Sequence, residues 1–193
     1  MPRPLIPNRR ETILDAAEAL VLSRGFDAMS VAGIADAAGI GKGAVYLEFS
    51  SKRDILDALL VRGNERLSAA VRAEVGERPR IGEVYAATAR ALLDDELMTA
   101  AFLDDRGVLG RHVDAADAER FRARHRGVVA WLERLRDDGR LSDAVEPEHL
   151  ALALSSATIG LLSAARLLGP LDRARLEGAI AALGSMAASF EAP

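Results

Sequence analysis

The sequence predicts an all-α protein with an N-terminal three-helix helix-turn-helix domain, joined by one long helix to a C-terminal helical domain. Half of the 193 residues are hydrophobic and only 4% are aromatic. Alanine and leucine recur at the three- and four-residue spacing of a helix face in nearly every long segment. Glycine and proline fall mainly between these segments. We expect the two domains to cover residues 1–53 and 54–193.

The first helix is expected to begin at Asn8, which forms a capping-box pattern with Glu11. Gly25 ends this helix, and Phe26 is placed to pack back on it. The apolar positions repeat at helical spacing and predict one buried face, made of Ile13, Leu14, Ala17, Leu20 and Val21.

Two short helices and a long one follow. Ser30 is a cap for the second helix, and Gly39 ends it. The third runs from about Lys42 to Phe49, with Val45 inward. Ser51-Lys52-Arg53-Asp54 is a second capping box, and it opens a helix that continues to Gly76.

Beyond Pro79 the periodicity predicts five more helices, near residues 81–94, 96–106, 115–138, 147–168 and 172–190. The longest apolar stretch, Leu150 to Ala165, is too short to span a bilayer and contains several hydroxyl side chains. We therefore expect it to form a buried helix, with no membrane contact.

Composition excludes several classes of function. The chain has no cysteine, which excludes disulfides and thiolate chemistry. The first ten residues lack an apolar signal core, so we expect a cytoplasmic protein. His112, Asp114 and Asp117 have no enforced metal-ligand spacing, and no catalytic triad or carboxylate pair stands out. We expect no cofactor, no metal and no enzymatic activity.

The run Gly39-Ile40-Gly41-Lys42-Gly43 resembles a phosphate-binding loop. A Walker A loop fails because Asp36 and Gly43 occupy positions that need glycine and a hydroxyl residue. A Rossmann turn fails because the preceding residues, 34–38, are typical of a helix and not of a strand. The glycines therefore join two helices, as in a helix-turn-helix.

The tight corner explains the residue types around it. Ala35 is small where the helices cross, Gly39 can take a left-handed conformation, and Val45 fills the wedge. The N-terminus of the third helix offers free amides and the positive end of a dipole. These suit a DNA phosphate, with the third helix in the major groove.

Residues 9–56 resemble the DNA-binding domain of tetracycline-repressor-type (TetR family) regulators, over about a quarter of the chain. Spacing and residue types agree at Gly25-Phe26, Ser30, Ile34-Ala35, Ala38-Gly39, Lys42-Gly43, Tyr46, Phe49 and Ser51-Lys52. The resemblance implies a homodimeric, ligand-responsive transcription regulator, usually a repressor, that binds a pseudo-palindromic operator in double-stranded DNA.

The resemblance also implies the residues that contact DNA. Lys42, Tyr46 and Lys52 would contact phosphates, with Ser30 near the backbone. Base edges would face Lys42, Gly43, Ala44 and Leu47. The chain departs from the commoner pattern at Gly41 and Ala44, where hydroxyl residues are frequent. Apolar contact, such as Ala44 with a thymine methyl, is favoured there over hydrogen bonding.

Each of these residues also has a plain structural interpretation. Tyr46 could be a half-buried core residue, and Lys52 could simply belong to the first turn of its helix. Glu48 could accept from a cytosine amine, but a pair with Lys52 is favoured. Arg9 and Arg10 could be solvated or could reach phosphate or the minor groove, and the sequence favours neither.

In the C-terminal domain, scattered apolar and aromatic side chains could line an effector pocket or be ordinary core: Tyr85, Met98, Phe102, Phe121, His125 and Trp131. We expect Phe102, His125 and Trp131 to contact a small-molecule effector. The last two helices carry many small residues, including Gly160 and Gly184, which favours a homodimer interface through these helices.

Two other functions are weighed against a regulator. One is a helical small-molecule-binding protein that has lost DNA binding. The other is an all-α enzyme, which would need a clustered acid/base or metal set. The effector, the operator sequence and the regulated genes are not specified by the sequence.

Overall fold

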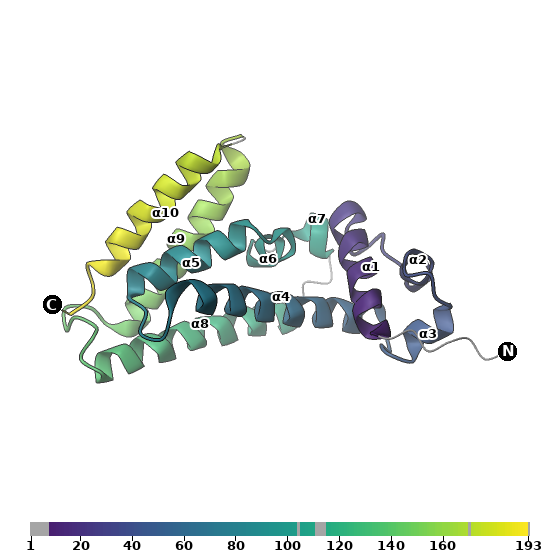
Figure 1. The fold of residues 1–193 in the computed structure, drawn as a ribbon, viewed down its shortest axis with the longest axis horizontal. Helices are drawn as coiled ribbons and strands as arrows, with labels where there is room; N and C mark the ends of the chain where they lie inside the picture. Colours follow the sequence, from purple (N-terminus) through teal and green to yellow (C-terminus); the bar gives the residue numbers. More distant parts are fainter. Residues whose placement is uncertain (1–7, 104, 111–114, 170, 193) are drawn as a thin grey trace. The chain divides into compact units, whose positions relative to one another are not determined.

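The computed structural model describes residues 8–103, 105–110, 115–169 and 171–192, and these residues form helices with no strand (Figure 1). The helices are α1 (Arg9–Arg24), α2 (Val31–Ala37), α3 (Lys42–Tyr46), α4 (Lys52–Val75), α5 (Ile81–Leu93), α6 (Glu96–Phe102), α7 (Arg106–Leu109), α8 (Ala115–Asp137), α9 (Pro147–Leu167) and α10 (Arg173–Ala188). The predicted all-α class is confirmed.

Two predicted helices have different bounds in the structure. The segment predicted as one helix over 96–106 forms α6, which ends at Phe102, and a separate one-turn helix, α7. The Asp105 carboxylate caps α7 by accepting from Gly107 N at 2.8 Å. The third helix ends at Tyr46 and not at Phe49, and Phe49 turns into the core at 5% exposure.

The described residues group into two compact units. The first takes its residues from 1–65 and 96–113, and the second from 66–95 and 114–193. Helix α4 contributes to both, because the division falls between Glu65 and Arg66. The domain boundaries expected from the sequence remain a prediction.

The first unit closes α1 to α4 around one apolar core. Val45 on α3 is fully buried between Ile34 of α2 and the inner faces of α1 and α4. Leu97 of α6 and Leu109 of α7 belong to the same core. The turn after α1 is held by α7, because Phe26 N donates to Val108 O at 2.7 Å.

Two of the three predicted helix caps are present in the structure. Ser30 caps α2 as predicted, since its hydroxyl accepts from Gly33 N at 3.0 Å. Ser51 likewise accepts from Asp54 N at 3.1 Å, whereas the Asp54 carboxylate accepts from Ser50 N at 3.2 Å and so completes a shifted box. The predicted box at Asn8 is wrong: Asn8 has a left-handed backbone, and its side chain caps nothing.

In the second unit, α10 packs against α5 (Figure 1). The two helices come closest at Gly82 and Gly184. A Cβ atom on Gly82 would lie 2.5 Å from the carbonyl oxygen of Gly184. Gly184 is therefore buried against α5 within the chain, and the predicted dimer interface through the last two helices stays a prediction. Gly160 has no atom within 4 Å of an added Cβ and is exposed.

The core of the second unit gathers apolar side chains of α5, α8, α9 and α10 around Ile81, Leu132, Leu150 and Ile180. Trp131 packs against this core and is half-buried. The prediction that the apolar α9 is a buried helix is wrong. Only 28% of the most apolar 18-residue stretch of α9 is buried within the chain. The helix is long and apolar enough to cross a membrane, but length and composition alone are weak evidence for a span.

Candidate nucleic-acid interface

The turn between α2 and α3 has the geometry that the glycine run predicts. Gly39 adopts a φ of +67°, which residues with a side chain rarely take. Ile40 N then donates to Ala35 O at 2.9 Å, and Ile40 is buried. Gly41 is extended and precedes α3 without a side-chain cap, as expected from the missing hydroxyl.

One face of α3 is left open by the fold. Val45 points inward, whereas Lys42, Gly43, Tyr46 and Leu47 are exposed. Tyr46 is 50% exposed and Leu47 is 76% exposed, so neither side chain belongs to the apolar core. A Cβ atom on Gly43 would meet nothing within 4 Å, so its backbone is open to a close approach.

Two other predicted contact residues are partly used by the fold. Ala44 is half-buried and packs against the core of the first unit. The Ser30 hydroxyl is exposed but already accepts from Gly33 N. Their roles toward DNA stay predictions.

Lys52 is also engaged within the chain. Its Nζ donates to Phe26 O at 2.9 Å and to Asp27 O at 3.4 Å. The same ammonium lies 4.3 Å from the centre of the Phe26 ring. Lys52 thus ties the start of α4 to the turn after α1, and its predicted phosphate contact remains untested.

Glu48 pairs with Arg9 and not, as predicted, with Lys52. Arg9 Nε and Nη2 both donate to Glu48 Oε1, at 2.9 and 2.5 Å. Arg10 donates to Glu48 O at 3.2 Å and stacks 4.3 Å from the centre of the Phe49 ring. Both arginines therefore bind the segment that follows α3, an interpretation that the sequence did not suggest.

The predicted effector residues are spread over the two units. Phe102 belongs to the first unit, whereas His125 and Trp131 lie on α8 in the second, and all three are half-buried. Burial lowers the pKa of the neighbouring Arg124 to about 10, so this partly buried side chain keeps its charge at neutral pH. The set stays a prediction. Phe121, His112, Asp114 and Asp117 lie outside the side chains that the structure describes.

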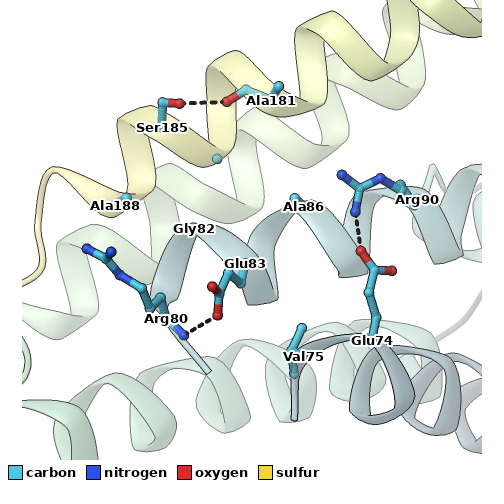
Figure 2. A pocket seen from close by; sticks show the side chains of 11 residues that line it. Glu74, Val75, Arg80, Gly82, Glu83, Ala86, Arg90, Ala181, Ser185 and Ala188 are labelled. Carbon is cyan, nitrogen blue, oxygen red and sulfur yellow. Dashed lines mark hydrogen bonds and ion pairs between the residues drawn. The ribbon is translucent and has the colours of Figure 1, made fainter. Parts of the chain in front are cut away.

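An open groove of about 500 Å³ lies in the second unit, between α5, α10 and the end of α4. Figure 2 shows the side chains that line it. The groove is lined mainly by small and charged residues, among them Gly82, Gly184, Arg80 and Arg90. Arg90 already pairs with Glu74 and, at 2.9 Å, with Glu177. None of the three predicted effector residues lines this groove. Among the described side chains, no three metal-ligating residues gather.

Comparison with known proteins identifies the open helix-turn-helix. Residues 13–59 match the family described as bacterial regulatory proteins, tetR family. The N-terminal part of the chain therefore matches the tetR family of bacterial regulatory proteins. The chain is 33% identical over 95 residues to the HTH-type transcriptional repressor KstR of Rhodococcus jostii, a match that covers 48% of this chain and 45% of that protein. It is 42% identical over 55 residues, 28% of each chain, to the HTH-type transcriptional repressor KstR2 of Mycobacterium tuberculosis.

These TetR family matches span less than half the length of the curated relatives. Solved structures extend the likeness in fold to nearly the whole chain. The fatty acid degradation regulator FadR from Bacillus halodurans has a TM-score of 0.72 at 16% identity and covers 95% of this chain and 96% of its own. The ketosteroid transcriptional regulator KstR2 of Mycobacterium tuberculosis has a TM-score of 0.62 at 19% identity, over 98% and 97%.

Proposed function

We propose that this protein is a cytoplasmic transcriptional repressor that binds operator DNA through α3 and is released by a small-molecule effector. The observation that carries the proposal is the open face of α3. The exposed side chains of Lys42, Tyr46 and Leu47 contribute little to the core. The backbone of Gly43 beside them is open to a close approach. The match to the TetR family and the relatives named as repressors support the same function.

The first test is a mobility shift with the DNA upstream of the protein's own coding region. Retarded DNA that survives a large excess of unrelated competitor supports sequence-specific binding. Binding that the competitor abolishes, or no binding at all, favours the alternative function, a helical small-molecule-binding protein that has lost DNA recognition.

The contact set proposed for DNA is Ser30, Lys42, Gly43, Ala44, Tyr46, Leu47 and Lys52. Tyr46→Phe should weaken binding by a similar factor for operator and unrelated DNA, because a phosphate contact carries no sequence information. Lys42→Ala should also reduce the salt slope of binding by roughly one unit per lost contact.

Lys52→Ala separates two roles of this side chain. If Lys52 contacts phosphate, the salt slope falls with the affinity. If it only holds Phe26 O, as its 2.9 Å bond suggests, the unfolding temperature falls while the salt slope is unchanged.

We propose further that the second unit forms a homodimer through α9 and α10. Large apolar side chains are exposed on both helices, namely Leu152 (60%), Ile159 (41%) and Met186 (64%). Leu152 and Ile159 are seven residues apart and share one side of α9 with Gly160 and Ser163. A second copy would cover these side chains, and an isologous pair is the commonest arrangement of homodimers.

Sedimentation tests the dimer. Wild-type protein should sediment as a dimer at micromolar concentration, and Ile159→Glu should shift it toward the monomer because a carboxylate would be buried in an apolar contact. A monomeric wild-type protein would refute the dimer and also the use of two operator half-sites.

The effector is proposed to act in the second unit near His125 and Trp131, and to change DNA affinity through α4. This helix is continuous over 24 residues and contains no proline. In a dimer, a tilt of α4 would alter the spacing of the two α3 helices, which must reach major-groove faces roughly 34–36 Å apart. A coupling of about 1–3 kcal/mol would give roughly 5–150-fold regulation.

A disulfide engineered between the two DNA-binding units of the dimer tests this switch, and the cysteine-free chain makes the design clean. Under oxidising conditions the locked dimer should keep its operator when effector is added, whereas the reduced dimer should release it. Equal release from both forms would refute the role of α4.

A further inference from the structure

Arg62 lies on α4 and reaches three carboxylates of α1 at once. Its Nη1 donates to Glu11 Oε2 at 3.0 Å and to Asp15 Oδ1 at 2.7 Å. Its Nη2 donates to Glu18 Oε2 at 2.5 Å. Only 16% of the Arg62 side chain is exposed, so the guanidinium sits between the two helices and not in open solvent.

The three carboxylates share the Arg62 guanidinium as a counter-charge. Glu11, Asp15 and Glu18 follow each other at intervals of four and three residues, so like charges share one face of α1 and repel. Burial alone would lower the pKa of Arg62, but the hydrogen bonds that Arg62 donates to Glu18, Glu11 and Asp15 outweigh it and raise the pKa overall. The charged form of the clamp is therefore favoured at any ordinary pH.

The N-terminal turn of α1 holds the segment that directly follows α3. Arg9 binds the Glu48 carboxylate, and Arg10 binds Glu48 O and stacks on Phe49. Glu48 lies two residues beyond Tyr46, the last residue of α3. Helix α1 therefore stands between α4, which it meets through Arg62, and the end of α3, which it meets through Arg9 and Arg10.

We propose that Arg62 is a positioning residue for DNA binding: it clamps α1 to α4, and α1 in turn fixes the direction in which α3 faces the DNA. This inference rests on the DNA binding proposed above. Contact side chains must be held to within about 0.5 Å by their supporting residues to make their bonds. A loosened α1 would leave α3 folded but aimed less uniformly at the groove.

The main test is Arg62→Met, which keeps an unbranched apolar stem and removes the charge. Operator affinity is measured at several salt concentrations and at a temperature where both proteins are fully folded by circular dichroism. We expect the Kd to rise roughly tenfold, by analogy with the loss found when a residue that orients a metal ligand is removed. The salt slope should not change, because no phosphate contact is lost.

A second variant, Glu18→Gln, separates positioning from simple electrostatics and disturbs folding less. Glu18 is 19% exposed and holds Arg62 Nη2. Removing a negative charge near the DNA-binding helices should tighten binding if only long-range charge matters. Positioning predicts the opposite sign, a Kd several-fold higher than wild type.

Two further variants serve as controls. Arg62→Lys keeps a cation that can reach part of the cluster, and it should recover part of the affinity lost in Arg62→Met. Arg66→Met removes the next arginine of α4, which pairs with Asp95 at 2.8 Å, and it should leave operator affinity unchanged.

Three results would overturn the proposal: wild-type affinity in folded Arg62→Met, a salt slope reduced by about one unit in that variant, or tighter binding by Glu18→Gln. The first would show a purely structural pair, the second a direct phosphate contact, and the third a charge effect. Wild-type protein that binds no operator would instead contradict the proposed function.

Discussion

The two units hold the same helix, α4, by different means. In the first unit, Ile55, Leu56, Leu59 and Leu60 of α4 are all buried in one apolar core. In the second unit, none of residues 66–75 is buried, and this half of α4 is held by exposed ion pairs such as Arg66–Asp95 at 2.8 Å. A buried leucine contributes about 1.5–3 kcal/mol, whereas an exposed ion pair contributes about 0–1 kcal/mol.

This difference indicates which half of α4 opens or moves at the lower free-energy cost. Segments with few buried apolar contacts open at low free-energy cost, and moving elements are drawn from such segments. The half of α4 in the first unit is therefore firmly held, and the half in the second unit is held by weaker contacts. If a ligand acts on the second unit as proposed, it needs to replace only those weaker contacts to shift the helix.

The largest expected effect comes from leucine deletions in the two halves. Leu59 is fully buried, so Leu59→Ala should lower the free energy of unfolding by about 2–5 kcal/mol. Leu67 is only half-buried, and Leu67→Ala should cost less than about 1 kcal/mol. Urea denaturation followed by circular dichroism measures both. Similar losses for the two variants would show that both halves of α4 are held equally firmly.

The second unit is packed most tightly where α5 meets α10 at Gly82 and Gly184. The Cβ of Gly82→Ala would lie 2.5 Å from a backbone oxygen that cannot easily move, so we expect a loss of about 1–3 kcal/mol. Gly127→Ala on the exposed face of α8 is the matched control, because an added Cβ would meet nothing within 4 Å there and the change should stabilise by up to about 1 kcal/mol. A neutral Gly82→Ala would mean that the two helices separate readily.

A smaller effect is expected from the ion pair on the lightly held half. Arg66→Met should cost about 0.2–1 kcal/mol in about 50 mM salt and almost nothing in about 1 M salt, because salt screens exposed charges. Unfolding free energies of wild type and variant at both salt concentrations give the answer. A loss that persists in high salt would show that Arg66 acts by packing.

The smallest predicted effect is the alkaline titration of the second-unit tyrosine. Burial raises the pKa of Tyr85, and the nearby Thr158 hydroxyl offsets this only partly. The neutral form is therefore favoured in the folded protein, and its contribution is complete below the unfolded pKa of about 10 and is lost as the pH rises through the folded value. Tyr85→Phe should flatten the fall in stability above about pH 10.

Unfolding free energies of wild type and Tyr85→Phe at a series of alkaline pH values check this. If stability falls as steeply in Tyr85→Phe as in wild type above about pH 10, the loss comes from groups other than Tyr85.

Local signals in the sequence were enough to predict the helices and the helix-turn-helix corner. Ser30, Gly39 and Val45 act within a few residues of their partners, so their roles follow from spacing alone. The break at Phe102 was missed because residues 96–106 keep a helical pattern without proline, and only the capped turn at Asp105 interrupts it.

Pairs between distant residues could not be predicted in the same way. Arg9 and Glu48 are 39 residues apart, and Arg62 and Glu11 are 51 apart, so neither spacing nor charge pattern names the partner. A usable signal did exist in the acidic row Glu11, Asp15 and Glu18, which needs a counter-charge. The contact of Gly184 with Gly82 could not be predicted either, because small residues allow close approach to a partner subunit and to a helix of the same chain equally well.

Trp131, half-buried against the core of the second unit, is the only tryptophan in the chain. The intrinsic fluorescence of the protein, excited at the red edge of indole absorption, therefore reports on this unit alone. The helix-turn-helix contributes no indole and stays spectroscopically silent. A screen of small molecules can read effector binding directly from the unlabelled wild-type protein, with or without DNA present, and so separate loss of ligand binding from loss of its effect on DNA.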